Sequence, residues 1–314
     1  MTAAHLFGQP WGMSAPAPLL GGFQAYEMYD VLERACASAG LDPKGAEVLR
    51  GHTNAVVRLR HDPVVVKIAR KGTPLTAVEN TIAFVRWLMG QGFPTVPLHP
   101  SLKQPLVVDG HAVTFWVYLP QNTSVTAADL AAPLRALHRL PSPPMPLRPL
   151  DNLTAIRASL AATRTLPEQD LALLGEIADR LQAALEDVDF ALPQAVVQGD
   201  PQHRNALHDP KRQRTVLCDW DTVAYGQPEW DLVTVEIHCR RFGHGRRHYK
   251  DFAARYGWDV TAWSGYPVLR DIRELRMITT NARKADHTPG TLTEVHRRIE
   301  GLRAGETDLA WNIL

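Results

Sequence analysis

The chain has 314 residues, of which 45% are hydrophobic and 21% charged, as in an ordinary folded globular protein. Its formal net charge of +1 offers no electrostatic attraction for nucleic acid. Three cysteines are too few for a disulfide framework, and we find neither a leader-like segment nor a membrane-spanning run. We therefore expect a cytoplasmic protein with no nucleic-acid and no membrane partner.

The N-terminal third alternates between helical and strand patterns. Residues 1–22, with scattered Pro, Gly and Ala, are expected to form a flexible arm. Apolar residues at helical spacing then predict a helix over residues 26–41. Residues 48–50 and 55–60 are typical of two strands around a turn at residues 51–54.

Residues 64–68 predict a buried strand that carries one cation, Lys67. A lysine in such a strand either extends to the edge of the sheet or meets an anion. The helix expected over residues 76–91 contains a single acid, Glu79, which is a possible partner for Lys67. Glu79 also completes a capping box with Thr76, and the sequence does not separate the two roles.

Further elements follow in the middle of the chain. Residues 105–108 and 111–117 predict a hairpin around Asp109-Gly110. Periodic apolar residues predict helices over residues 126–140, 151–163, 167–188, 265–285 and 291–303.

Residues 195–233 contain the clearest chemical pattern. Two apolar runs, residues 196–197 and 215–218, are followed by Asp200 with Asn205 and by Asp219-Trp220-Asp221. We expect the runs to form a small paired sheet that directs these polar side chains into a cleft. An Asp-x-x-x-x-Asn loop followed by an Asp after a strand is the arrangement used in phosphoryl transfer.

That chemistry assigns a role to each side chain. A hydroxyl that attacks ATP needs a carboxylate to accept its proton, which predicts Asp200 as the base. Mg²⁺ prefers oxygen ligands, which predicts Asn205 and Asp219 as its ligands, with Asp221 as a second-metal or outer contact. As an alternative, Asp200-Pro201 simply marks a turn.

The motifs Gln198-Gly199-Asp200-x-x-x-x-Asn205, Asp219-Trp220-Asp221 and Gly226-x-Pro228-x-x-Asp231-Leu232 resemble the aminoglycoside phosphotransferase/choline kinase family. That family usually has His where this chain has Gln198, at a position that supports the catalytic loop. The resemblance is specific in these motifs and extends more weakly over residues 48–285.

The resemblance implies an α+β fold of two lobes, similar to that of protein kinases. An N-terminal lobe with an antiparallel sheet would span residues 23–117 and bind the nucleotide. A hinge would follow at residues 118–122, and a mainly helical catalytic and acceptor-binding lobe at residues 123–314.

The resemblance also implies where ATP, or GTP as an alternative, would bind. The backbone of the short loop at Thr53 and Asn54 would cover the phosphates, and Lys67 would position them. Adenine would bond to the backbone near Val117 and Leu119. Asp231 is similar to the family's aspartate that braces the catalytic loop; otherwise it is an ordinary acid at a helix N-terminus.

The acceptor is less well defined by the sequence. A polycationic aminoglycoside requires carboxylates in its site, whereas residues 235–314 have 14 Lys/Arg and 10 Asp/Glu. The arginines of residues 265–285 alternate with acids, which favours salt-bridged helix faces. The histidines of residues 238–248 are a weak candidate for a metal site, because Gly243 and Gly245 interrupt a helix.

The predicted activity is ATP- and Mg²⁺-dependent phosphorylation of a hydroxyl on a small molecule, either an antibiotic or a sugar or amino-alcohol metabolite, by a monomer or weak homodimer. One alternative is a nucleotide-binding pseudokinase, favoured by Gln198 and by the absence of a Gly-rich loop. Another is a metal-dependent hydrolase built on Asp200, His203, His208 and Asp219, which would leave Lys67 unexplained.

Overall fold

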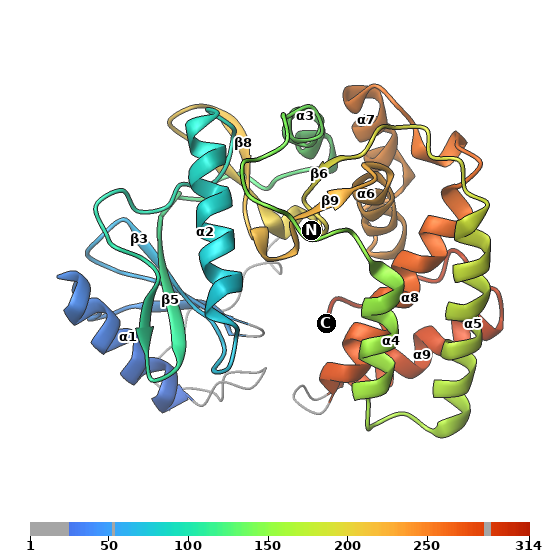
Figure 1. Cartoon of the computed structure of the whole chain (residues 1–314), viewed down its shortest axis with the longest axis horizontal. Coiled ribbons are helices and arrows are strands. Elements are labelled where there is room, and N and C mark those ends of the chain that lie inside the picture. The colour runs from blue at the N-terminus through green and yellow to red at the C-terminus, as the bar shows by residue number, and fades with distance from the viewer. Residues whose placement is uncertain (1–24, 52–53, 286–289) are drawn as a thin grey trace, which may run out of the picture.

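The computed structural model describes residues 25–51, 54–285 and 290–314. An antiparallel sheet with two helices forms one side of the molecule, and a helical bundle forms the other (Figure 1). Four short strands and the loops between them lie in the middle (Figure 1). This confirms the predicted α+β, protein-kinase-like architecture. No helix in the described part of the chain is long and apolar enough to cross a bilayer.

The sheet has five antiparallel strands in the order β1-β2-β3-β5-β4. They are β1 (Glu47–Gly51), β2 (Ala55–Arg58), β3 (Val64–Ile68), β4 (Leu106–Val108) and β5 (His111–Val117). Helix α1 (Ala25–Ala39) buries one face, including Met28, Val31 and Leu32, in the core beneath this sheet. On the central strand β3, Val64, Val66 and Ile68 are buried in that same core, so Lys67 projects from the opposite face.

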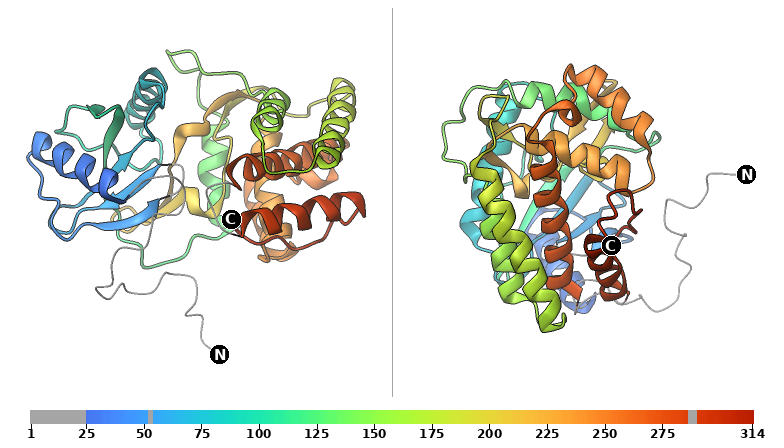
Figure 2. Two further views of the ribbon diagram at one scale, coloured as in Figure 1. Left: turned by 90° about the horizontal axis from the view of Figure 1, so that it is seen from below. Right: turned by 90° about the vertical axis from the view of Figure 1, so that its right-hand side faces the viewer.

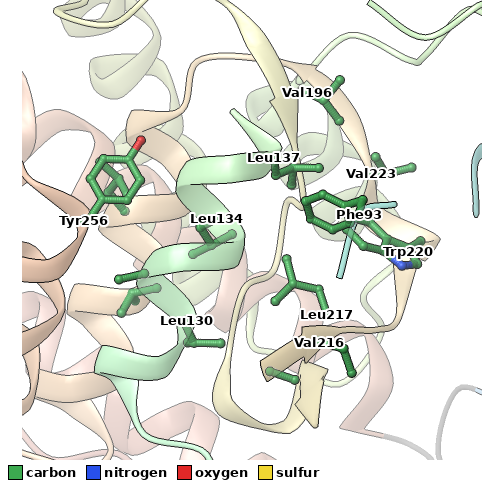
Figure 3. Packing of buried hydrophobic residues seen from close by; sticks show 14 of the residues in the cluster. Phe93, Leu130, Leu134, Leu137, Val196, Val216, Leu217, Trp220, Val223 and Tyr256 are labelled. Atoms are coloured by element: carbon green, nitrogen blue, oxygen red, sulfur yellow. The ribbon is translucent and has the colours of Figure 1, made fainter. Parts of the chain in front are cut away.

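Helix α2 (Leu75–Gly90) joins the sheet to the rest of the molecule. Its buried residues, among them Phe84 and Leu88, belong to the same core cluster as the middle strands and the helices beyond them. The ring of Phe84 packs edge-on against Trp220, with 5.4 Å between the centroids. In the view of Figure 3, Phe93 lies in this core between Trp220 and Leu137. This core cluster therefore joins the two sides of the molecule, and it is separate from the core between α1 and the sheet.

The helical side contains α3 (Ala127–Leu137), α4 (Asn152–Ala162), α5 (Glu168–Glu186), α6 (Glu229–Arg241), α7 (Arg246–Tyr256), α8 (Tyr266–Lys284) and α9 (Thr291–Arg303). Helix α8 is central, because it contacts α4, α5, α6 and α9 (Figure 2). Consequently, most side chains of α8 meet other elements rather than solvent.

The middle strands form two separate pairs. Strand β6 (Ala195–Val197) pairs with β9 (Ala224–Gly226), and β7 (Ala206–Asp209) pairs with β8 (Arg214–Leu217). Our prediction that the two apolar runs form one paired sheet was therefore wrong, because the first run pairs with the later strand β9 and the second with the adjacent strand β7. Their polar tips are still brought together, by side-chain hydrogen bonds described below.

Most predicted helices are present with ends shifted by one to three residues. Helices α6 and α7 were not predicted. Helix α6 is buried on nearly every side, so its sequence lacks the one-sided apolar stripe that indicates a surface helix. Gly243 and Gly245, which both have positive φ, separate the two helices, as expected from their conformational freedom.

Candidate active site

The loop of residues 198–205, which we call the catalytic loop, follows β6 and is held by a buried carboxylate. Asp231 of α6 accepts hydrogen bonds from the backbone N–H groups of Gln198 at 2.7 Å and Gly199 at 2.9 Å. Its Oδ2 also lies 3.1 Å from Nε2 of His138. Asp231 has no exposed surface, so these donors compensate for the loss of water. The side chain braces the loop, as the resemblance implied.

The second residue of this loop must be glycine. Gly199 has φ +86°, and a Cβ placed there would lie 2.4 Å from the carbonyl oxygen of Thr222. The chain therefore turns sharply beside residues 219–222, which brings the catalytic loop against the Asp-Trp-Asp segment.

Gln198 connects the two segments. Its Nε2 donates to the carbonyls of Cys218 at 3.2 Å and Asp219 at 3.0 Å, and its Oε1 accepts from the N–H of Asp200 at 2.7 Å. The side chain is fully buried, and the amide uses both its donor and its acceptor groups. Gln198 thus supports the catalytic loop at the position where the family usually has His.

The carboxylate of Asp200 accepts three side-chain hydrogen bonds. The donors are Gln202 at 2.8 Å, Asn205 at 3.3 Å and the guanidinium of Arg273 at 2.5 Å. Burial raises the pKa of Asp200 above its ordinary value, although Arg273 acts in the opposite direction. A carboxylate with a raised pKa, next to residues suited to a metal ion, can accept a proton from a hydroxyl group.

Asn205 and Asp219 lie side by side at the ends of adjoining segments. The N–H of Cys218 donates to the carbonyl of Asn205 at 2.9 Å, which places Asp219 one residue from that contact. Asp219 has a left-handed backbone with φ 58°, a conformation that non-glycine residues hold only where the surroundings enforce it.

The donor set at this point fits Mg²⁺. Asn205 donates through Nδ2 to the carbonyl and the carboxylate of Asp200, and no described group donates to its Oδ1. An amide oxygen and the carboxylate of Asp219 are hard ligands of the kind that Mg²⁺ prefers. No group of three or more His, Cys, Asp or Glu side chains forms a metal cage in residues 25–51, 54–285 and 290–314.

Lys67 meets the Asp-Trp-Asp segment rather than an acid on α2. Its Nζ lies 3.0 Å from Oδ1 of Asp219 and 2.8 Å from Oδ2 of Asp221. Burial alone would lower the pKa of Lys67, but the two carboxylates raise it overall. Burial alone would likewise raise the pKa of Asp219, but the charge of Lys67 lowers it overall. Lys67 therefore stays protonated and keeps Asp219 ionised.

Glu79 is exposed on α2, and the described ion pairs of Lys67 do not include it. The predicted capping box with Thr76 was wrong, because α2 begins at Leu75 with Pro74 before it and has no side-chain cap. Neither of the two roles considered for Glu79 is formed in this structure.

The loop between β1 and β2 is described in part. Asn54 donates to Oδ2 of Asp221 at 2.9 Å, next to the contact of Lys67 with that same carboxylate. Thr53, the other residue predicted in this loop, lies outside the described residues. Arg50, which sequence reasoning missed, donates to the carbonyl of Arg204 in the catalytic loop. These contacts connect the sheet to both loops of the site.

Leu119, in the segment after β5, has a backbone N–H without a hydrogen-bond partner among the described residues. The N–H of Val117 donates to Pro97 at 2.9 Å, and that of Tyr118 donates to Pro63 at 2.7 Å. The N–H of Leu119, in contrast, has no hydrogen bond to any described residue. A ligand with an acceptor atom can use the amide of Leu119, whereas Val117 can offer only its carbonyl.

Arg273 is the residue of the site that the sequence interpretation missed most clearly. We expected the charges of α8 to pair along the helix face, but Arg273 pairs with Asp200, 73 residues away. Glu274, which would have been a partner on α8, instead pairs with Arg240 and Arg241 of α6. The only signal in the sequence was the excess of arginine in residues 265–285.

A model of a phosphotransferase enzyme family matches residues 44–272, almost three quarters of the chain. A comparison with curated proteins finds no match. Solved structures with the same fold include choline kinase LicA from Streptococcus pneumoniae (TM-score 0.67, 15% identity, 88% of this chain and 99% of that chain). The amicoumacin kinase hAmiN has a TM-score of 0.68 at 14% identity, over 91% of this chain and 96% of that chain. Aminoglycoside phosphotransferase APH(3'')-Id from Streptomyces rimosus has a TM-score of 0.59 at 22% identity, over 79% of this chain and 98% of that chain.

Proposed function

The chain belongs to the phosphotransferase enzyme family, and from this premise we propose that it transfers the γ-phosphoryl group of ATP to a hydroxyl of a small molecule. The observation that carries the proposal is the convergence of Asp200, Asn205 and Asp219. Gln198 and Asp231 hold these residues together through buried hydrogen bonds. The arrangement combines a base with two metal ligands, as phosphoryl transfer requires.

In the proposed reaction the acceptor oxygen bonds to the γ-phosphorus, and the bond to the oxygen bridging to ADP breaks. ADP leaves with the electron pair, and the hydroxyl proton passes to the carboxylate of Asp200. Asp200 is suited to this step because burial raises its pKa and three donors fix its orientation.

Asp219 and Oδ1 of Asn205 would hold Mg²⁺, which supplies positive charge next to the β- and γ-phosphates when bound. Lys67 is positioned at Asp219 and Asp221, so phosphates held at that point would lie within reach of its ammonium group. Asn54 at the same carboxylate supports a contact between its loop and the phosphates.

The adenine ring would bond near the start of the segment that follows β5. The unpartnered N–H of Leu119 supports a hydrogen bond to a ring nitrogen, with the carbonyl of Val117 beside it. GTP remains the alternative nucleotide, because a backbone donor alone does not select between the two bases.

Complexes of proteins with this fold agree with a nucleotide and an alcohol acceptor. One solved structure is amicoumacin kinase with AMP-PNP, Ca²⁺ and Ami, and another is spectinomycin phosphotransferase with ADP and its antibiotic. A third is choline kinase LicA with AMP. Their acceptors differ from one another, so they support the reaction type and leave the acceptor of this chain open.

A nucleotide-binding protein without transfer activity is the second candidate. The observation in its favour is Gln198 in place of the usual His. Against it, Gln198 makes three hydrogen bonds that hold the catalytic loop, and the proposed base and both metal ligands are present.

The test is incubation with γ-labelled ATP, Mg²⁺ and a panel of hydroxylated metabolites and antibiotics. The wild-type protein should label at least one acceptor, and Asp200→Asn should abolish labelling. Nucleotide affinity measured by calorimetry should change little in Asp200→Asn, because the proposed nucleotide contacts lie at other residues. Tight nucleotide binding without transfer to any acceptor would favour the second candidate, and equal loss of binding and transfer would contradict the role of Asp200.

A further inference from the structure

Three arginines form a group that we call the arginine cluster: Arg273, which pairs with Asp200, and Arg276 and Arg148 next to it. Arg273 and Arg276 are three residues apart and therefore project from one face of α8. Arg148 comes from the segment before α4 and donates to the carbonyls of Asp221 at 3.1 Å and Val223 at 3.2 Å. The cluster thus borders both the catalytic loop and the Asp-Trp-Asp segment.

Arg273 is buried and only partly satisfied. Its side chain is 8% exposed, and its guanidinium lies 5.5 Å from the centre of the Trp230 ring. One Nη donates to Asp200, but the buried Nε has no hydrogen-bond partner among the residues that the structure describes. A buried guanidinium with a free donor can bind a further acceptor atom.

Arg276 has no counter-ion among the residues that the structure describes. It is half-buried, and within the described residues it forms no ion pair and no side-chain hydrogen bond. The charges that act most strongly on it are those of Arg273 and Arg148, which repel it, and that of Asp200, which attracts it. Burial and these two arginines lower the pKa of Arg276 to about 10, so it remains charged at neutral pH.

A half-buried cation held against two other cations is unfavourable unless an anion completes the group. The nucleotide is not the anion that this position suits best. Lys67 pairs with Asp219 and Asp221, where the phosphates and Mg²⁺ are proposed to bind. Arg273 pairs instead with Asp200, the residue that faces the acceptor hydroxyl in the proposed reaction. Lys67 therefore lies at the proposed metal and phosphate side of the site, and Arg273 lies at the side of the proposed base.

We propose that the acceptor carries an anionic group, a carboxylate or a phosphate, close to its reacting hydroxyl, and that Arg273 and Arg276 bind this group. The inference rests on the proposed function, because it assigns the acceptor of that reaction. Arginine suits the role, since its guanidinium can donate two parallel hydrogen bonds to a carboxylate or phosphate.

Binding of such an anion has a consequence for the base. The guanidinium of Arg273 that now pairs with Asp200 would turn partly to the acceptor, which frees Oδ1 of Asp200 to meet the hydroxyl. A polycationic acceptor would instead bring ammonium groups against three guanidinium groups. The cluster thus selects for anionic alcohols and against polyamines.

The test uses four small probes that share a hydroxyl group and differ in charge: glycerol, ethanolamine, D-glycerate and glycerol 3-phosphate. Each is titrated calorimetrically into wild-type protein saturated with ADP and Mg²⁺. We expect D-glycerate, glycerol 3-phosphate or both to bind at least tenfold more tightly than glycerol and ethanolamine. The difference in affinity between D-glycerate and glycerol 3-phosphate distinguishes a carboxylate site from a phosphate site.

Variants of α8 locate the binding. Arg276→Gln should weaken the tighter anion at least tenfold, and Arg276→Lys should recover part of that loss. Arg246→Gln removes the same charge from α7, where the side chain is 80% exposed, and should leave the affinity within about twofold, since an exposed charge is screened by salt. ADP affinity should be unchanged in all three variants.

Three results would overturn the inference. The first is anionic probes that bind no more tightly than the neutral and cationic ones. The second is unchanged binding of the anionic probes to Arg276→Gln, and the third is weaker binding of ADP to that variant. The proposed function is judged separately, by transfer of label from ATP. Transfer only to neutral or cationic acceptors would refute the anionic acceptor alone, whereas Arg276-dependent anion binding without any transfer would refute the phosphotransferase reaction.

Discussion

Asp231→Asn tests the brace beneath the catalytic loop. The wild-type carboxylate has no exposed surface and accepts from Gln198 and Gly199 through separate oxygens. Asparagine has the same shape but replaces one oxygen with NH₂. The amide can take two orientations, and in the more favourable one its oxygen accepts from the N–H of Gln198 and lies at Nε2 of His138. Its NH₂ group then faces the N–H of Gly199. One hydrogen bond is then lost, and a buried N–H is left without an acceptor.

The size of the effect follows from these contacts. A hydrogen bond to a charged group contributes about 1.5–3 kcal/mol, and an unsatisfied buried donor costs about 1–3 kcal/mol. We therefore expect the free energy of unfolding to fall by about 3 kcal/mol. With a urea dependence of about 3 kcal/mol per M, the unfolding midpoint should decrease by about 1 M.

The assay is urea unfolding followed by tryptophan fluorescence, with Asp179→Asn as the matched control. Asp179 has a 68% exposed side chain and pairs with Arg157 on the surface, so its loss should cost no more than about 1 kcal/mol. If Asp231→Asn and Asp179→Asn unfold at the same urea concentration, the carboxylate does not brace the loop as the hydrogen bonds indicate.

Four other changes have defined outcomes. Lys67→Met should lower kcat/KM for ATP at least tenfold, because Asp219 and Asp221 lose their shared cation; an unchanged value would mean that Lys67 has no part in nucleotide use. Only deprotonated Asp200 is a base, and burial raises its pKa, so kcat/KM should fall as the pH is lowered, with a midpoint above the pKa of an ordinary aspartate. Arg273 lowers the pKa of Asp200, so Arg273→Gln should move this midpoint to higher pH in a pH–rate profile. Gly199→Ala should reduce the urea stability by more than about 1 kcal/mol, because φ +86° and the Thr222 carbonyl both oppose a Cβ; wild-type stability would refute the close approach. Trp311→Ala should reduce the stability by about 3 kcal/mol without changing the KM for ATP, as expected for a ring that is 5% exposed and packs against Arg241 and Phe242.

The spacing of apolar residues was sufficient to predict a helix where that helix has one buried face. In α5 the buried residues Leu174, Ala178 and Leu181 recur at helical spacing, and the predicted helix is present. It was insufficient for α6, where residues on all sides are buried and no periodic contrast remains. The pairing of β6 with β9 was also missed, because short apolar runs do not specify their partner strands.

In the site, contacts within a short motif could be predicted from the sequence, whereas contacts between distant residues could not. The order of Gln198, Asp200 and Asn205 along the chain limits how far apart they can lie, so their convergence could be predicted. The partner of Lys67 could not be predicted, since Asp219 is 152 residues away and Glu79 was the only acid on the following helix. Arg273 was hidden for the same reason, among arginines with acids adjacent in the sequence.

Each proposed substrate meets a cation that is already paired inside the site. Lys67 neutralises Asp219 and Asp221, and Arg273 neutralises Asp200. Asp219 would hold Mg²⁺ in the proposed reaction, so Lys67 would be available to the phosphates. An anionic acceptor would release Asp200 from Arg273 in the same manner. On this proposal two existing ion pairs would be exchanged when the substrates bind, and Arg276, which has no counter-ion among the described residues, would gain an anionic partner. Both changes agree with the high cost of leaving buried charges alone.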